Sequence, residues 1–196
     1  MNLSKHHISW YIPGRTIYFH DYKDKTKYYK YKLVEPYGKN FSKDFKPAYT
    51  PLEMLKMGVF EGKYLNDREY EFPIEWFEES KNKRSLIANP KLNYFGVKSR
   101  MSFQEWEKNG WLYGEGNIGW FYWYCQYFIG RRTEFDEIQI NRWKKFKRHY
   151  IQLKNAVDNR KKNKNLPIVT RFKQRQALLQ WSWQCILPGE NIKKDL

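Results

Sequence analysis

The segment GWFYWYCQYFIG, residues 119–130, is the stretch of this sequence that decides the fold. It is apolar nearly all round, which is typical of a buried helix or a buried strand. We favour a helix, because residues 119–129 are long for a strand and Gly130 stands where a helix C-cap belongs. The segment therefore predicts a central, buried helix.

Downstream of this segment the sequence predicts a long amphipathic helix. Thr133 is expected to cap it, with acidic residues in its first turn. Apolar residues recur at helical spacing on one face, namely Phe135, Ile138, Trp143, Phe146, Tyr150, Leu153 and Val157. The opposite face is expected to carry Arg142, Lys145, Arg148 and Gln152. A last helix is expected from a cap at Thr170 through Gln184, with Trp183 as an exposed ring.

Upstream, residues 1–47 read as extended, with β-rich runs at 8–12, 16–19 and 28–34. They predict a small antiparallel sheet or hairpin, or else an aromatic arm packed on the helices. Thr50-Pro51 starts a short helix ending near Gly58. Ser102 and Glu105 form a capping box that opens another. The predicted fold is mainly α (α+β): an extended or β segment, 1–47, and a helical domain, 48–196, together one compact unit.

Composition bounds the class of protein. Aromatic residues make up 19% of the 196, which argues against disorder. The sequence contains no run of eighteen apolar residues, so it predicts no membrane-spanning helix. The N-terminus lacks the apolar core of a secretion signal. Two cysteines are too few for a disulfide framework. We expect an intracellular protein of the cytoplasm or nucleus of a host cell, with association with a virion as an alternative.

Positive charge is concentrated in residues 138–175. This segment holds thirteen Lys and Arg against the single acid Asp158, a net +12 of the chain's +16. Such clustering favours a polyanion partner over a merely solvated helix face, nucleic acid being the commonest and an anionic membrane the rival. DNA is expected before RNA, without membrane insertion and with the oligomeric state open. The residues predicted to contact phosphates are Arg131, Arg132, Arg142, Lys145, Arg148, Arg171 and Arg175.

An aromatic pocket is predicted around Trp120, Trp123 and Tyr124, at the edge of the basic segment. Arg131-Arg132 follows it at a turn between helices, where two guanidinium groups can clamp a phosphate. Pairing with the acids that follow, Glu134, Asp136 and Glu137, is the equally weighted alternative.

The sequence assigns no catalytic residue, cofactor or metal. His20-Asp21 is the one base–carboxylate pair, and Cys125 reads as a buried apolar residue. Residues 61–79 carry seven carboxylates against Lys63 and Arg68. A metal site is conceivable there, but Pro73 disfavours one helical face, so the segment predicts a solvated acidic surface. The G-x-G-x-x-G of residues 114–119 lacks a surrounding βαβ pattern and predicts no dinucleotide site.

Several short motifs resemble a family of bacterial, fungal and viral proteins to which no function is assigned. They are GWFxWYC at 119–125, GRR at 130–132, QIxRW at 139–143 and RQALLQW at 175–181, with YTP, ML and GVF between residues 49 and 60. The resemblance implies that one site is formed by Trp120, Trp123, Tyr124, Arg131, Arg132, Arg142 and Gln180.

The expected function is nucleic-acid binding through phosphate contacts. The first alternative is an enzyme acting on nucleobases, nucleotides or DNA, of glycosylase or nuclease type, with the aromatic pocket as its site. The second is a structural or virion-associated protein.

Overall fold

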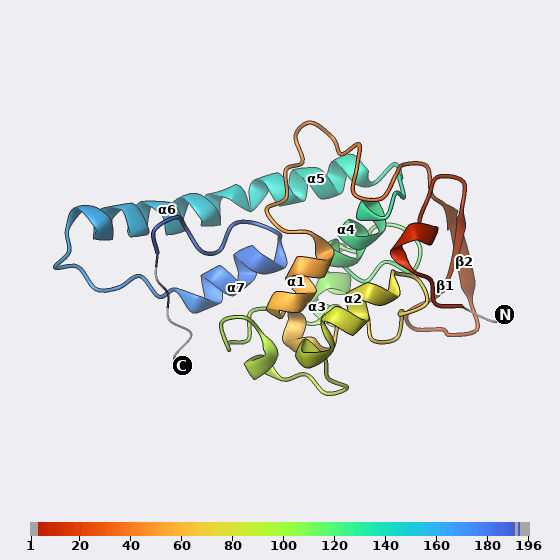
Figure 1. The fold of residues 1–196 in the computed structure, drawn as a ribbon, viewed down its shortest axis with the longest axis horizontal. Coiled ribbons are helices and arrows are strands. Elements are labelled where there is room, and N and C mark those ends of the chain that lie inside the picture. The colour runs from red at the N-terminus through yellow and green to blue at the C-terminus, as the bar shows by residue number, and fades with distance from the viewer. Residues whose placement is uncertain (1–3, 191, 193–196) are drawn as a thin grey trace.

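A computed structural model describes residues 4–190 and 192. The fold is mainly α-helical with a small antiparallel sheet near the N-terminus, as the sequence predicts (Figure 1). The strands are β1 (Thr16–His20) and β2 (Tyr28–Lys32). The helices are α1 (Pro51–Met57), α2 (Ile74–Glu79), α3 (Phe103–Lys108), α4 (Trp120–Phe128), α5 (Asp136–Lys145), α6 (Lys147–Lys162) and α7 (Phe172–Gln180). Short 3₁₀ segments lie at Ile8–Trp10, Phe60–Gly62, Lys81–Lys83 and Pro90–Leu92.

Helix α4 occupies the centre of the molecule, and all nine of its residues are buried. The predicted central helix is therefore confirmed. Its polar tips are satisfied individually, as buried polar atoms must be. Trp120 Nε1 donates to the carbonyl of Gln139 (3.1 Å), Trp123 Nε1 to Asp136 (2.8 Å) and the Tyr124 hydroxyl to the carbonyl of Tyr49 (2.8 Å).

The hairpin packs at the C-terminal end of α4. Its strands pair with Thr16 opposite Lys32 and His20 opposite Tyr28. The chain leaving β2 is fixed by the backbone amides of Val34 and Glu35, which both donate to the carbonyl of Gly130. Gly130 has φ +113, and a Cβ there would lie 2.1 Å from the Glu35 carbonyl oxygen. Only glycine fits this junction. The run 8–12, predicted as extended, instead forms the 3₁₀ turn Ile8–Trp10.

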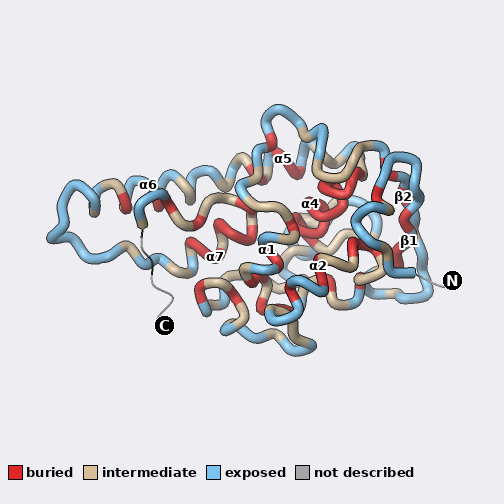
Figure 2. The backbone as a smooth tube through the Cα atoms, viewed as in Figure 1, coloured by how far each residue is buried: buried red, intermediate tan, exposed pale blue. Residues whose placement is uncertain are grey.

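The predicted long amphipathic helix is two helices, α5 and α6, joined at Phe146. Phe146 has ψ −14, well away from the α-helical value of about −42. The predicted cap at Thr133 is wrong: α5 begins at Asp136, whose carboxylate accepts from Thr133 in the preceding turn. Beyond this break α6 extends away from the buried centre, and its far end and the following loop are exposed (Figure 2).

Helix α7 returns antiparallel to α6 (Figure 1). It begins after Arg171, which is in the left-handed conformation (φ 42), and it ends at Gln180, so the predicted cap at Thr170 and end at Gln184 are wrong. The expected exposed ring, Trp183, is half-buried. It stacks on Trp143 at a centroid distance of 4.5 Å.

The caps predicted at Thr50 and Ser102 are confirmed, each as a full capping box. The acidic segment differs from expectation, because Arg68 and Glu71 lie fully inside the protein. The Glu71 carboxylate accepts from Tyr122, Tyr31 and Gln126, and lies 3.5 Å from the Arg68 guanidinium. These donors compensate the burial of the carboxylate. A count of charges along the sequence cannot detect such burial.

Candidate functional site

One face of α5 and α6 carries a continuous line of exposed polar side chains. Its members are spaced alternately four and three residues apart, which places them on one side of a helix. All are exposed and none is acidic: Asn141, Lys145, Arg148, Gln152, Asn155, Asn159 and Lys162. We call these residues the polar row. Its five members on α6, from Arg148 to Lys162, span about 21 Å at about 1.5 Å per residue, and Asn141 and Lys145 continue the row on α5.

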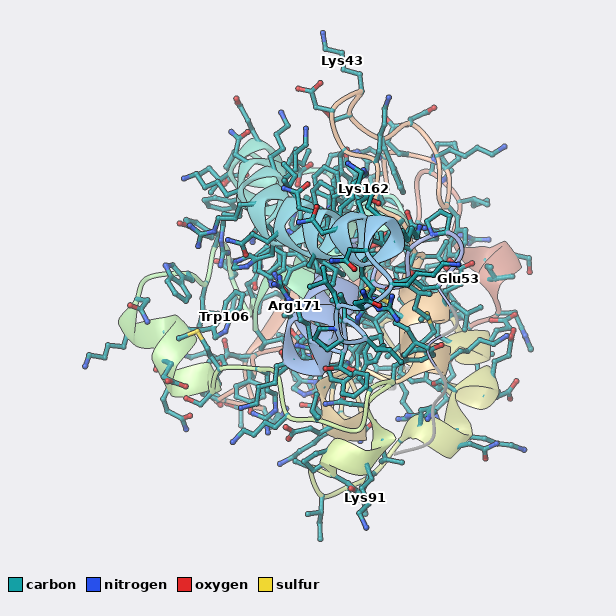
Figure 3. The ribbon with its side chains drawn as sticks, turned by 90° about the vertical axis from the view of Figure 1, so that its left-hand side faces the viewer. Lys43, Glu53, Lys91, Trp106, Lys162 and Arg171 are labelled. Carbon is teal, nitrogen blue, oxygen red and sulfur yellow. The ribbon has the colours of Figure 1, made fainter. Side chains whose placement is uncertain are left out.

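Most cations of residues 138–175 remain exposed. They are Lys145, Lys147, Arg148, Lys154, Lys161, Lys162, Lys164, Arg171 and Lys173. Within the described part of the chain, the side chains of five of these donate no hydrogen bond, in contrast to those of Arg148, Lys154, Lys161 and Arg171. The five are Lys145, Lys147, Lys162, Lys164 and Lys173. Their ammonium groups keep full hydrogen-bonding capacity for an external anion. Figure 3 shows Lys162 and Arg171 on the face formed by the ends of α6 and α7.

Arg142, predicted on the solvent face, lies in an aromatic cage. Its guanidinium is 4.9 Å from the Trp106 ring centre and 5.7 Å from that of Trp181, and it donates to the carbonyl of Trp111 (3.0 Å). Burial lowers the pKa of Arg142 from its usual value. The loop that follows α3 covers this position, so Arg142 ties that loop to α5.

Arg131 and Arg132 are half-buried and committed to internal partners. Arg131 donates to Gln126 (2.7 Å) and lies over the Tyr31 ring at 4.5 Å. Arg132 lies 3.8 Å from the centre of the Tyr127 ring and donates to four backbone carbonyls. Neither forms an ion pair with the acids that follow, among the described residues. Both arginines stabilise the junction between α4 and the N-terminal segment.

Arg175 is fully buried, which removes it from the set of phosphate contacts. It forms a bidentate pair with Glu190 (2.6 and 2.9 Å). It also donates to the carbonyls of Val169, Thr170 and Cys185. Arg171 is exposed and donates to the carbonyl of Gln152 (3.2 Å). Of the seven predicted contacts, Lys145, Arg148 and Arg171 lie exposed on the α5–α7 surface.

Beside the start of α6 lies a cleft of about 1050 Å³. It is formed where three distant segments meet, residues 60–67, 99–106 and 177–181, together with α4 and Phe146. Its aromatic lining comprises Tyr22, Phe60, Tyr64, Phe103, Trp106, Trp111, Trp120, Phe121, Phe146 and Trp181. We call it the aromatic cleft. Figure 3 labels Trp106, which lies on α3 and lines this cleft.

Only one of the three predicted pocket aromatics lines this cleft. Trp120 does so, together with Gln180, whereas Trp123 and Tyr124 are buried in the core. The cleft also excludes Arg131, Arg132 and Arg142 from its lining, so the structure does not bring the family-implied cluster together as one site. The missed residues, Phe60, Tyr64, Phe103 and Trp106 among them, are aromatics in short or irregular segments, which carry no helical stripe to reveal them.

A polar group borders the cleft at Asp67. Its carboxylate lies 2.5 Å from Lys25 Nζ, which is 2.6 Å from His20 Nε2, and the Tyr70 hydroxyl hydrogen-bonds with His20 Nδ1. Burial and the Lys25 charge lower the pKa of His20. Burial would raise the pKa of Asp67, but the Lys25 hydrogen bond and charge outweigh it and lower the pKa. His20 is thus neutral and Asp67 ionised at neutral pH, with His20 Nε2 3.8 Å from the Asp67 carboxylate. The predicted partner, Asp21, accepts instead from the backbone amides of Lys23 and Asp24.

Cys125 is buried, and burial raises the pKa of its thiol well above the usual value. In the described residues, no group of three or more His, Cys, Asp or Glu side chains is arranged to hold a metal ion. Within residues 4–190 and 192, none of the helices has the length and apolarity needed to cross a membrane.

The chain matches no protein-family model, no curated protein and no solved structure.

Proposed function

We propose that this protein binds nucleic acid, DNA in the first instance, by holding phosphates along the polar row and the neighbouring exposed lysines. The polar row carries the proposal. It offers cations and amides without an acid, and both are common partners of phosphate oxygens. The part of the row on α6, about 21 Å long, corresponds to roughly six nucleotides at about 3.4 Å per step along one strand.

The charge distribution supports the same proposal. The net +12 of residues 138–175 lies mainly on the exposed arm formed by α6, α7 and their loop, rather than being neutralised internally. A surface with so much unopposed charge attracts polyanions over long range and repels itself without them.

The test is a fluorescence-anisotropy titration of labelled DNA at 50 and 200 mM salt, repeated with RNA of the same sequence. If six to ten phosphates are contacted, affinity should fall by roughly 10³–10⁵ between these salt concentrations. Absence of binding at the lower salt concentration contradicts the proposal. Tighter binding of RNA than of DNA would leave the proposed phosphate interface in place and make RNA the preferred partner.

A second candidate function is an enzyme acting on nucleobases, favoured by one observation: Asp67 is an ionised carboxylate that lines the aromatic cleft. An ionised carboxylate beside a cleft can stabilise the positive charge that develops on a sugar when a glycosidic bond breaks. The assay is incubation with single- and double-stranded DNA, followed by chromatography for released bases and by gel electrophoresis for cleaved strands. Product that persists in an Asp67→Asn variant argues against this role.

A further inference from the structure

The polar row and the aromatic cleft meet at the first turn of α6. Arg148 belongs to the polar row and also lines the cleft. Phe146, where α5 and α6 join, lines the cleft and stacks on Trp181 at 5.0 Å with the rings 11° apart. A strand lying along the polar row therefore passes the mouth of the cleft at Arg148.

The cleft is lined by two buried rings of α4, Trp120 and Phe121, and by further rings that the fold leaves partly exposed. Helix α3 contains no buried residue, yet it places both Phe103 and Trp106 in the cleft. Across the lining, Phe60 and Tyr64 pack at 4.6 Å, and Trp106 stacks with Trp181 at 6.1 Å. Aromatic area left open in a concave site is typical of ligand grooves.

The size and charge of the aromatic cleft restrict the ligand that it can bind. At about 1050 Å³ the cleft lies at the upper limit of pockets for single small molecules, about 300–1,000 Å³, which favours a segment of a chain. Its charged lining is Lys63, Asp67, Arg100 and Arg148. Arg100 pairs with the buried Glu61 carboxylate (2.7 Å) and Asp67 with Lys25, which leaves Lys63 and Arg148 as the lining cations without a carboxylate partner among the described residues. This lining suits a ligand that combines planar apolar faces with negative charge. An unpaired stretch of nucleic acid has both properties.

Two of the three side-chain amides that line the cleft, those of Gln180 and Asn66, are already engaged, and the third, Gln104, is exposed. Gln180 donates to the carbonyl of Ser99, and its oxygen lies 3.5 Å from the amide nitrogen of Phe60. Asn66 donates to two carbonyls and accepts from Arg84. Base edges would therefore find few free partners there, and stacking would dominate, which tolerates any base.

We infer that the aromatic cleft receives unpaired bases of a strand whose phosphates lie along the polar row, so that the protein prefers single-stranded to double-stranded nucleic acid without strong sequence preference. This inference rests on the proposed function. Bases in a duplex are paired and stacked, so they cannot enter the cleft without being extruded.

The test compares one labelled DNA strand, alone and annealed to its complement, by anisotropy at fixed salt. Trp106→Ala should weaken single-strand binding about 5- to 150-fold for each stacked base lost and leave duplex binding unchanged. Trp106→Phe should retain most of the affinity. Trp10→Ala is the matched control, because Trp10 is a half-buried ring that stacks on His6 outside the cleft, and it should change neither affinity.

A second variant guards against misfolding of the first. Phe103→Ala, at a half-buried position at the start of α3, should show the same selective loss. A 2-aminopurine base in the strand should lose fluorescence on binding to the unaltered protein and keep it with either variant. Thymidine monophosphate should not displace the strand at millimolar concentration.

The outcomes separate the two proposals. Equal losses for strand and duplex, or no loss in either cleft variant, overturn the cleft as a base site while the phosphate interface stands. Displacement by thymidine monophosphate overturns it also, by assigning the cleft to a free nucleotide. Failure of the unaltered protein to bind strand or duplex at low salt instead overturns the proposed function.

Discussion

Cations occur in two contrasting settings in this molecule. Arg68 and Arg175 are completely enclosed, and each is held by a carboxylate and by further hydrogen bonds. The lysines of the polar row, Lys145 and Lys162, are exposed to solvent, and their ammonium groups donate to no other described residue. The first group holds segments of the chain together, and the second leaves its charge available to a partner.

The contrast teaches that charge density alone does not locate a binding surface. Arg175 lies inside the basic segment 138–175 but belongs to the enclosed group. What separates the groups is whether each donor already has an acceptor, and that depends on residues far away in the sequence. The two groups should therefore respond differently to mutation. Substitution of an enclosed arginine should lower the stability of the protein, whereas substitution of an exposed cation should lower its affinity for nucleic acid.

The largest expected effect is on Arg68. Arg68→Met should lower the free energy of unfolding by about 3–5 kcal/mol, because it leaves the buried Glu71 carboxylate without its cation. Urea denaturation measures the change. Arg15→Met, at an exposed position, is the matched control and should stay within about 0.5 kcal/mol. A loss below about 1 kcal/mol for Arg68→Met would mean that solvent reaches this pair.

Arg175→Met comes next. Removing a guanidinium that pairs with Glu190 and three carbonyls should cost about 2–4 kcal/mol of unfolding free energy. DNA affinity of the folded protein should be unchanged. Arg171→Met, four residues earlier, should do the reverse, lowering affinity with little change in stability. Reduced affinity in folded Arg175→Met would contradict the separation of the two groups.

Local patterns predicted the elements well where one segment decides its own structure. The uniformly apolar run of α4, the capping boxes at Thr50 and Ser102, and the hairpin all follow from neighbouring residues. The break at Phe146 carries no proline or glycine to signal it. Arg171 adopts a left-handed conformation that its residue type rarely favours, so no sequence rule points to it.

The candidate site was predictable only in part. The exposed cations of α5 and α6 follow from helical spacing, so the exposure of Lys145 and Arg148 agrees with the prediction. Arg142 was misplaced, because a loop from residues 109–113 covers its side of α5. The aromatic cleft joins residues 60–67, 99–106 and 177–181, and no periodicity within any of these segments reveals that they meet.

A double variant of the polar row gives a smaller, purely functional effect. Lys145→Ala with Lys162→Ala should reduce the slope of log affinity against log salt by about 1.8, since each lost phosphate contact removes about 0.9. Stability in urea should be nearly unchanged. The matched control is Lys30→Ala with Lys32→Ala, two exposed lysines on β2 at the opposite end of the molecule. An equal change of slope in both pairs would mean that binding senses only net charge.

The smallest effect is expected at Asp158, the one acid of the basic segment. Its carboxylate accepts from Lys154 Nζ at 2.6 Å, and that hydrogen bond lowers the pKa of Asp158, so the pair is charged at neutral pH. Asp158→Asn frees the Lys154 ammonium for a phosphate and removes a repulsive charge. DNA affinity should rise about two- to fivefold at low salt, the range expected for one exposed ion pair, and the gain should shrink as salt is added. Titrations at two salt concentrations measure it, with Asp44→Asn, which frees Lys144 near the start of the row, as the comparison. A gain for Asp44→Asn and none for Asp158→Asn would indicate that the phosphates lie along α5 rather than along α6. The cations available to a partner would then be limited to those nearest the aromatic cleft.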